Sequence, residues 1–500
     1  MRLALPSAFV LLLAGCPVPP STCAEDDDCG RGTSCRAGAC VPVGSEGEGE
    51  GEGEGEGEGE GEGEGEGAGE GDGEGDGDGE GDGEGEGEGE GEGEGEGEGE
   101  GEGDPTLVEE LSAGLGHTCA RMQSGELRCF GYGVHGQLGL NDDASIGDNE
   151  PASAGGPVAL DGAVIDVANG WYHTCALRQD GNVYCFGLGG NGRLGYGNGD
   201  WVGDDELPLS VGAVSVGVPV RAVTAGAEHT CAQTSTNAVR CWGEGSSGRL
   251  GYGNSQTVGR SNFPSSAGDV PVGGAVKQVV AGGFHTCALL VDGSVRCWGQ
   301  APAHGGDTHE PIGDDELPGA VNPVAVTNLG ENVNALAAGE HHTCALLDTG
   351  SVRCWGIGSF GRLGVPDIYE NIGDDEAPQS HPLVNLGLPA LAIAAGGEHS
   401  CAILEDRTVR CWGRGVFGQL GTLSSEEIGD DEDPADWPVV DVGVPVVSLA
   451  LGDHYSCAVT DTGRALCWGL GDLGRLGYGN QSEIGDNEAP STAGSVPIVP

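Results

Sequence analysis

Basic residues are scarce in this sequence. Its 500 residues include only 20 lysines and arginines against 81 aspartates and glutamates, which gives a formal net charge of −61. Nucleic-acid binding requires clusters of basic side chains against phosphate, so we expect no nucleic-acid partner. The same shortage argues against attraction to an anionic membrane surface. Cations, basic proteins and neutral ligands remain as partners.

The sequence also has no cysteine left over for catalysis. Its 19 cysteines comprise Cys16, four between Cys23 and Cys40, and seven later pairs. Apart from Cys16 the cysteines can all be paired, which indicates disulfides formed in an oxidising compartment. Glycine is abundant, at 101 residues, but has no collagen-like period. It is concentrated in an acidic tract and in a repeat region.

The apolar run near the N-terminus is too short to cross a bilayer. It covers Leu3–Ala14 after Arg2 and leads into Leu13-Ala14-Gly15-Cys16, which resembles a bacterial lipobox. We therefore expect residues 1–15 to be a lipoprotein signal peptide and Cys16 to be the lipidated mature N-terminus. The alternative is a plain cleaved signal with an unrelated cysteine. The predicted location is the bacterial cell envelope, on the outer surface or in the periplasm, with membrane contact through the lipid only.

Two segments without a hydrophobic core follow. Residues 16–45 form a small Cys-rich segment that two disulfides would hold, in one of three connectivities, with a four-thiolate zinc site as the alternative. Residues 46–105 alternate acid and glycine, which predicts a disordered, extended linker; a weak cation sponge is the other interpretation of this tract. The four cysteines of the first segment are Cys23, Cys29, Cys35 and Cys40.

Residues 106–500 contain seven copies of one unit. The first cysteines of the pairs lie 56 or 57 residues apart, and each partner follows ten residues later. Each pair flanks a hairpin whose three-residue loop ends in glycine at the left-handed position. This register places the two cysteines opposite each other, within disulfide range. The predicted disulfides are Cys119–Cys129, Cys175–Cys185, Cys231–Cys241, Cys287–Cys297, Cys344–Cys354, Cys401–Cys411 and Cys467 with Cys457.

The loop glycine is replaced in two of the units. Asn237 takes its place in the third unit, and Asn is the next best residue for that conformation. Arg407 takes it in the sixth, which predicts a strained or altered turn there.

The seven units predict an all-β fold, a seven-bladed β-propeller with four strands per blade. The last strand of the sequence, Val496–Val499, matches Pro157–Leu160, and Leu107–Leu111 matches Val164–Val167. We therefore expect the C-terminal residues to supply a missing strand of the first blade, which would tie the termini together.

The repeated motifs G-x-x-H-T-C-A-L, W-G or F-G, and G-[RQ]-L-G resemble the regulator of chromosome condensation repeat family. Trp242-Gly243 with Gly248-Arg249-Leu250-Gly251 is one example, and the resemblance covers residues 106–500. It implies a seven-bladed propeller. The eukaryotic namesake exchanges nucleotide on a nuclear GTPase and binds chromatin, which does not fit an exported acidic lipoprotein. The resemblance therefore favours binding and leaves the specific ligand open.

Histidines recur just before the first cysteine of each unit. Six lie two residues before it, and we expect His454 to hold the equivalent place in the seventh. Metal ligation requires three or four of them to converge, whereas seven equivalent blades would spread them around a ring, so we expect structural hydrogen bonds. The six are His117, His173, His229, His285, His342 and His399.

An aromatic residue follows the second cysteine of every unit. We expect these rings to pack between blades, because aromatic side chains bury large areas. They are Phe130, Phe186, Trp242, Trp298, Trp355, Trp412 and Trp468.

An acidic turn, [IV]-G-D-[DN]-E, recurs in six units and is replaced by Val258-Gly259-Arg260-Ser261-Asn262 in the third. We interpret it as a solvated loop whose carboxylates accept hydrogen bonds from backbone amides. Adjacent carboxylates are not expected to face one ion together, but calcium is the alternative ligand. The calcium candidates are Asp148, Glu150, Asp204, Asp205, Asp314, Asp315, Asp374, Asp375, Asp430, Asp431, Asp486 and Glu488.

The sequence predicts a binding module rather than an enzyme, with no cofactor and as a monomer. The module would present a propeller face to a protein or glycan ligand at the cell surface. The first alternative is a calcium-dependent adhesive or structural protein. The second is a propeller lyase or glycosidase, for which residues 303–309, with two histidines and an aspartate, are the one local candidate.

Overall fold

The computed structural model describes residues 33–36, 39–42, 106–306, 308–326 and 331–500. The chain divides into two units, residues 1–94 and 95–500. Cys16, the expected signal peptide and the whole of the expected linker lie outside the described residues. Among the described residues, no helix has the length and apolarity needed to cross a membrane.

In the first unit, two short strands form an antiparallel pair. They are β1 (Thr33–Arg36) and β2 (Ala39–Pro42), and their register places Cys35 opposite Cys40.

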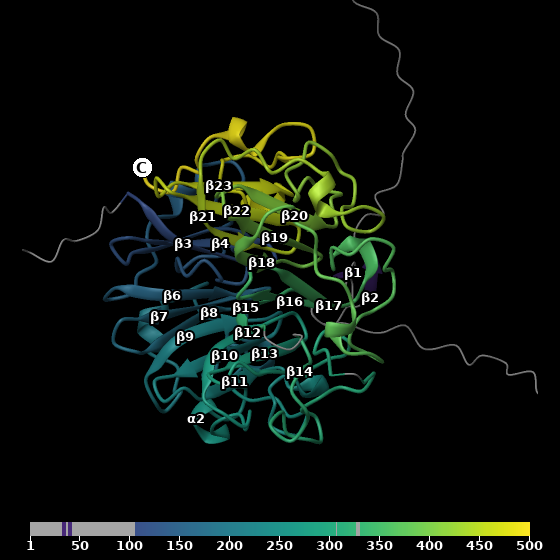
Figure 1. The fold of residues 1–500 in the computed structure, drawn as a ribbon. Helices are drawn as coiled ribbons and strands as arrows, with labels where there is room; N and C mark the ends of the chain where they lie inside the picture. The colour runs from purple at the N-terminus through teal and green to yellow at the C-terminus, as the bar shows by residue number, and fades with distance from the viewer. Residues whose placement is uncertain (1–32, 37–38, 43–105, 307, 327–330) are drawn as a thin grey trace, which may run out of the picture. The chain divides into compact units, whose positions relative to one another are not determined.

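The second unit is a β-propeller of seven three-stranded antiparallel sheets (Figure 1). The first strands line a central channel. They are β3 (Val108–Ala113), β6 (Val164–Asn169), β9 (Val220–Ala225), β12 (Val276–Ala281), β15 (Val333–Ala338), β18 (Ala390–Ala395) and β21 (Val446–Leu451).

The second strands carry the first cysteine of each pair. They are β4 (His117–Met122), β7 (His173–Arg178), β10 (His229–Thr234), β13 (His285–Leu290), β16 (His342–Leu347), β19 (His399–Leu404) and β22 (Tyr455–Thr460). The third strands are β5 (Leu127–Gly131), β8 (Val183–Gly187), β11 (Val239–Gly243), β14 (Val295–Gly299), β17 (Val352–Gly356), β20 (Val409–Gly413) and β23 (Ala465–Gly469).

Helical segments are confined to the loops. They are α1 (Pro208–Val211), α2 (Pro264–Ala267), η2 (Ala152–Gly155), η3 (Gly190–Gly192), η4 (Ser246–Gly248), η5 (Ser359–Gly361), η6 (Pro378–Ser380), η7 (Pro434–Asp436), η8 (Asp472–Gly474) and η9 (Pro490–Ala493).

The prediction of four strands per blade is wrong. The outer segment of each blade forms no regular strand; in blade 1 it is attached by the hydrogen bond from Val158 N to Leu127 O, 2.8 Å. Prolines such as Pro157 and Pro497 lie in these segments and remove ladder donors, which keeps the pairing short.

The prediction that the C-terminal residues complete blade 1 is also wrong. Val496 N donates to Ala465 O of blade 7, 2.8 Å, as Val158 does to its own blade. Blade 1 already has its first strand, β3, so each blade comes from one continuous stretch of chain. Blades 7 and 1 meet side by side (Figure 1), and Val108 N donates to Gly463 O, 2.8 Å.

The hairpin register agrees with the prediction. Cys287 lies opposite Cys297 and Leu289 opposite Val295, and the same pattern recurs in every blade. Each of the seven cysteine pairs forms a disulfide across its hairpin, with the two residues ten apart in sequence. The sulfurs are buried and staple the second strand to the third.

The blade-6 hairpin keeps its turn in spite of Arg407. This residue has a φ of +67°, close to the +62° of Asn237 and the +87° of Gly293 at equivalent positions. Arg407 N still donates to Leu404 O, 2.9 Å. The turn is therefore retained at the cost of a left-handed backbone on a residue with a Cβ.

Replacing Arg407 with glycine should stabilise the propeller. Glycine adopts the left-handed backbone without strain, which stabilises the folded state, but it also gives the unfolded chain more conformational entropy. The net gain in the free energy of unfolding is about 0.5–1 kcal/mol. Guanidinium unfolding of R407G beside wild type measures it. Asp406→Gly, one position earlier, is the control and should destabilise, because the Asp406 carboxylate accepts from Thr408 N, 3.0 Å.

Candidate functional site

The histidines before the cysteines form a hydrogen-bonded ring between blades. Each is fully buried, and its Nε2 lies 2.7–2.9 Å from the hydroxyl of a Thr or Ser in the next blade. In blade 3 that hydroxyl, on Thr230, donates its one proton to Arg193 O, 3.0 Å. His173 Nε2 must therefore carry the proton that bonds Thr230. The predicted structural role is confirmed for six histidines.

The assignment of His454 to this ring is wrong. Tyr455 takes the seventh place, with its hydroxyl donating to His117 O, 2.7 Å, and accepting from Thr118 Oγ1, 2.9 Å. His454 is half-buried nearby, with Nε2 3.2 Å from the Asp453 carboxylate. The chain spacing already distinguishes the two residues, because His454 lies three residues before Cys457.

Burial holds the ring histidines neutral. It lowers the pKa of His117, His285 and His399 to about 3, and that of the other three ring members well below its ordinary value. Each of these imidazoles is fixed through its Nε2 by a hydroxyl of the next blade, and the six contacts together help to hold the propeller closed.

The aromatic residues after the second cysteines pack between blades as predicted, at 0–1% exposure. Five are tryptophans whose indole N–H donates to a backbone carbonyl of the preceding blade, for example Trp242 to Arg193 O at 2.9 Å. The last glycine of each G-[RQ]-L-G motif leaves room for the ring, as Gly195 does for Trp242.

Each acidic turn packs against a loop of the preceding blade, and we call this contact a seam. The glycine of each turn touches the G-[RQ]-L-G loop of the preceding blade; a Cβ on Gly147 would lie 2.5 Å from Gly474 O. In blades 4 and 5 the turn glutamate accepts from the turn glycine N–H, at 3.1 and 3.2 Å. The predicted capping of backbone amides is therefore present, and Asn262 performs it in blade 3, at 2.9 Å.

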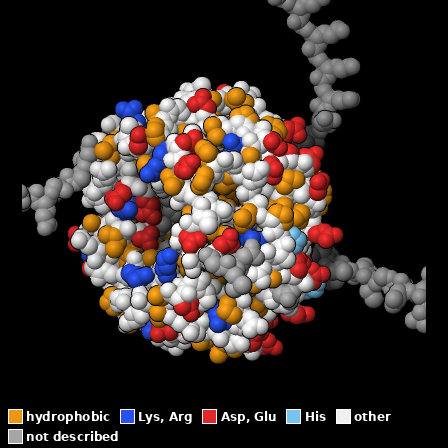
Figure 2. All heavy atoms as spheres, viewed as in Figure 1, with side chains coloured by type: hydrophobic (Ala, Val, Ile, Leu, Met, Phe, Trp, Pro, Cys, Tyr) orange, Lys and Arg blue, Asp and Glu red, His pale blue; other side chains and the backbone are white. Residues whose placement is uncertain are grey.

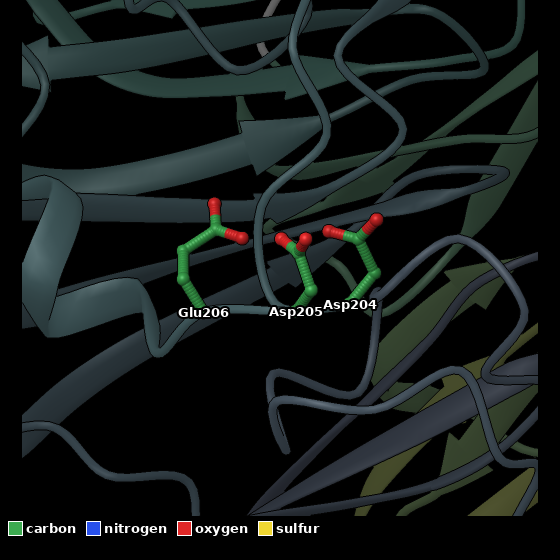
Figure 3. Close-up of side chains that lie close together, drawn as sticks. All are labelled: Asp204, Asp205 and Glu206. Atoms are coloured by element: carbon green, nitrogen blue, oxygen red, sulfur yellow. The ribbon is translucent and has the colours of Figure 1, made fainter.

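Four acidic turns also gather their carboxylates, which the sequence did not predict. One oxygen from each of Asp204, Asp205 and Glu206 lies within 4.8 Å of the others, and the three side chains rise on one side of the turn (Figure 3). Desolvation and the two neighbouring aspartates raise the pKa of Glu206 to about 7. The equivalent triads are Asp314-Asp315-Glu316, Asp374-Asp375-Glu376 and Asp430-Asp431-Glu432. Asp148, Glu150, Asp486 and Glu488 belong to turns that have Asn in the middle and form no such triad among the described residues.

The stretch 303–309, the local candidate for catalysis, has a packing role where it is described. His304 is fully buried, its Nε2 lies 2.9 Å from Glu310 O, and its Nδ1 accepts from Gly306 N at 2.9 Å. His304 takes the place of the leucine in G-[RQ]-L-G. His309 is exposed, 3.6 Å from the Asp374 carboxylate, and Asp307 lies outside the described residues.

The two faces of the propeller differ. We name one the loop face: it consists of the loops between the first and second strands and the longer loops that follow the third strands. Backbone bonds join the two kinds of loop, as from Tyr132 N to Gly116 O, 2.8 Å. The hairpin face carries the turns between the second and third strands.

Aromatic side chains gather on the loop face. At blades 1 and 2, His135 lies edge-on to Tyr172 and Trp201, with ring centroids 5.2 and 4.8 Å apart, and Tyr132 lies 5.7 Å from His135. We name these four residues the aromatic cluster.

Two further aromatic groups lie around the same face. Phe284 stacks on His341 at 5.0 Å and meets Trp171 at 5.6 Å, with the Arg249 guanidinium 5.0 Å from its ring centre. Arg414 lies 4.9 Å from the Phe360 ring and 5.9 Å from that of Phe417.

Sequence reasoning missed these aromatics. Several occupy the two variable positions of the G-x-x-H motif, as in Gly170-Trp171-Tyr172-His173. The residue type at these two positions varies between units whose other positions are regular. Because equivalent loops lie on one face of a propeller, this variation could have indicated an aromatic surface there.

The channel opens on the loop face and holds a cavity of about 380 Å³ whose lining includes Trp171, Glu340 and Asp453. Its wall is mostly Ala, Gly, Val and Ser or Thr, with Glu110 and Asp166 deep inside. Burial and the nearby Asp166 carboxylate raise the pKa of Glu110 to about 7, although the Arg121 guanidinium 2.7 Å away acts to lower it.

Figure 2 shows acidic and hydrophobic side chains interspersed over one side of the molecule.

Comparison with known proteins agrees with this architecture. A model of the RCC1-like domain matches residues 197–499. Models of the regulator of chromosome condensation (RCC1) repeat match residues 108–137, 164–193 and 124–177. The ultraviolet-B receptor UVR8 of Arabidopsis thaliana is 31% identical over 384 residues, which are 75% of this chain and 80% of that protein.

Solved structures share the fold at low identity. Human WBSCR16 superposes with a TM-score of 0.56 at 19% identity, over 72% of this chain and 92% of that one. Yeast RCC1 (Prp20), solved bound to Kap60, gives a TM-score of 0.55 at 21% identity, over 76% and 84%.

Proposed function

Because this chain belongs to the regulator of chromosome condensation repeat family, we propose that it is a recognition module that binds a protein ligand through the loop face. The aromatic side chains of that face carry the proposal. Trp, Tyr and Arg are the residues that most often dominate binding energy at protein interfaces, and here they converge from different blades. Yeast RCC1 (Prp20), which shares the fold, has been solved bound to the protein Kap60.

Binding rather than catalysis fits the polar groups of the propeller. The ring histidines are each held by a hydroxyl of the next blade, and His304 is held by backbone atoms on both nitrogens. A glycan is the alternative ligand, because sugars also stack on Trp and Tyr. A calcium-dependent adhesive role is the second candidate, and the four carboxylate triads favour it.

We further place the module in the bacterial cell envelope. Lipidation of Cys16 would anchor the chain, and the Glu-Gly tract of residues 46–105 would hold the propeller away from the membrane. The acidic tract would also resist adhesion to the anionic lipids beneath it.

Capture from cell-surface and culture extracts tests the loop face. The full chain is used as bait beside a loop-face variant, F284A/F360A, and a hairpin-face variant, V291S, whose valine is 65% exposed. We expect the loop-face variant to retain less than about a fifth of the captured protein, as loss of a contact worth about 1 kcal/mol or more would do. V291S should capture as wild type does.

Two outcomes point elsewhere. Equal capture by F284A/F360A and wild type would remove the loop face from the proposal. Capture that disappears with a chelator and returns with calcium would favour the calcium-dependent role instead.

A further inference from the structure

At three places on the loop face, the arginine of an ion pair is buried beneath a more exposed carboxylate. Arg193, Arg362 and Arg475 have side chains only 2–4% exposed. Their carboxylate partners lie nearer the solvent: Glu228 is 29% exposed, Glu398 18% and Asp472 49%. At these three places a partner meets the carboxylate before the guanidinium group, whereas Arg414, 28% exposed, is the more exposed member of its pair with Glu398.

The aromatic cluster of blades 1 and 2 lies beside one of the acidic triads. Trp201 is 37% exposed and stands three residues before Asp204 in the chain. The backbone of the triad also contacts the loop that carries His135: a Cβ on Gly136, the next residue, would lie 2.5 Å from Asp204 N. The aromatic cluster and the triad thus lie on two loops that are in contact with each other.

The triad has unmet capacity for hydrogen bonds. Asp204 Oδ1 is buried and accepts none from the described residues. The three carboxylates repel one another, and no arginine or lysine pairs with them among the described residues. The equivalent seam in blade 3 differs, because Arg260 stands where the other turns have aspartate.

We propose that this seam recognises the arginine or lysine side chains of a basic protein segment, with the alkyl stem and cation packed on Trp201 and the charge paired with Asp205 and Glu206. Aromatic rings attract guanidinium and ammonium groups, and carboxylates form charge-assisted hydrogen bonds with them. The inference rests on the proposed protein-binding function and specifies the chemistry of the partner. The net charge of −61 on the chain adds long-range attraction for a basic partner.

Calorimetric titration of the full chain with an oligo-arginine peptide tests the inference. The matched probe is the same peptide with citrulline, which has the shape of arginine without its charge. We expect the arginine peptide to bind and the citrulline peptide not to bind. Trp201→Ala should weaken the arginine peptide about tenfold, because one aromatic contact to a cation is lost.

Two controls separate this seam from background attraction by the acidic chain. Asp205→Asn/Glu206→Gln should weaken the peptide about as much as W201A. Phe263→Ala, which removes another exposed ring next to the turn that carries Arg260, should leave binding unchanged. Attraction to the Glu-Gly tract is common to all variants and cancels in the comparison. Melting temperatures near that of wild type would show that the variants are folded.

Equal affinity of W201A, D205N/E206Q and wild type would overturn the inference, as would equal binding of the two peptides. Binding of a neutral oligosaccharide that depends on Trp201 would replace the basic partner with a glycan. These outcomes differ from failure of the protein-binding proposal, which is measured by capture with F284A/F360A and does not involve Trp201.

Discussion

Acidification from pH 7 to pH 5 unfolds the propeller or brings it close to unfolding. The six ring histidines are neutral in the folded state because burial holds their pKa values far below the ordinary 6.5. In the unfolded chain they titrate near 6.5. The unfolded state therefore binds more protons between these values, and stability is lost as the pH falls through that window.

The expected effect is large because the histidines act together. Uptake of about six protons on unfolding corresponds to a slope of up to about 8 kcal/mol per pH unit, against a usual domain stability on the order of 10 kcal/mol. Carboxyl groups with a raised pKa, such as Glu206 and Glu432 at about 7, counteract this loss of stability on acidification. They stabilise the folded state at low pH, and that stabilisation is lost as the pH rises from about 4.5 to 7. Glu206 and Glu432 are partly exposed, so solvent screens their share. Glu110, whose pKa burial also raises to about 7, opposes the loss more strongly.

Scanning calorimetry at pH 7, 6 and 5 measures the loss, and buffers of different ionisation enthalpy give the proton uptake. His285→Tyr is the matched variant, because it copies the natural Tyr455 of blade 7. It should keep near-wild-type stability at pH 7 and take up one proton fewer on unfolding at pH 5. A transition temperature that does not change between pH 7 and pH 5 would show that burial does not hold these groups neutral.

Gly282→Ala should destabilise the propeller by about 3–5 kcal/mol. A Cβ at this position would collide with the ring of His285 and with Gly339 O of the next blade. Neither can retreat easily, since the ring is fully buried and its Nε2 is held 2.7 Å from Thr343 Oγ1. Overpacking costs about 1–3 kcal/mol, and a broken buried hydrogen bond adds about 1–3 kcal/mol.

Gly199→Ala is the control for this prediction. A Cβ on Gly199 meets only Arg260 Nε, at 4.0 Å, so a change within about 0.5 kcal/mol is expected. Urea unfolding of both variants gives the comparison. Similar free energies of unfolding for G282A and G199A would mean that the G-x-x-H glycine is not required for packing between blades.

Features confined to one hairpin could be predicted from the sequence. The ten-residue interval between cysteines, with glycine or Asn237 at the loop, fixes which residues face each other, because a three-residue loop leaves one register. Arg407 shows how strong this constraint is, since the turn keeps its shape even with an unsuitable residue. The seven-fold repetition then gives the number of blades.

Features between units were predicted less well. The His454 assignment failed although the chain spacing pointed to Tyr455. The triad geometry of Asp204, Asp205 and Glu206 was not expected, because adjacent side chains in an extended chain diverge, whereas this turn brings them to one side.

The repeat, the hairpins, the cysteine pairing and the family follow from the chain alone, because each depends on residues within a few tens of positions of one another. The packing of blade on blade fixes which loops share a face, which histidine meets which hydroxyl, and where Tyr132, Tyr172 and Trp201 come together. Those contacts join residues up to 338 apart in the chain, and their geometry depends on the angle at which one blade packs on the next. Side-chain volumes in the closed ring set that angle, and no local pattern in the chain encodes it.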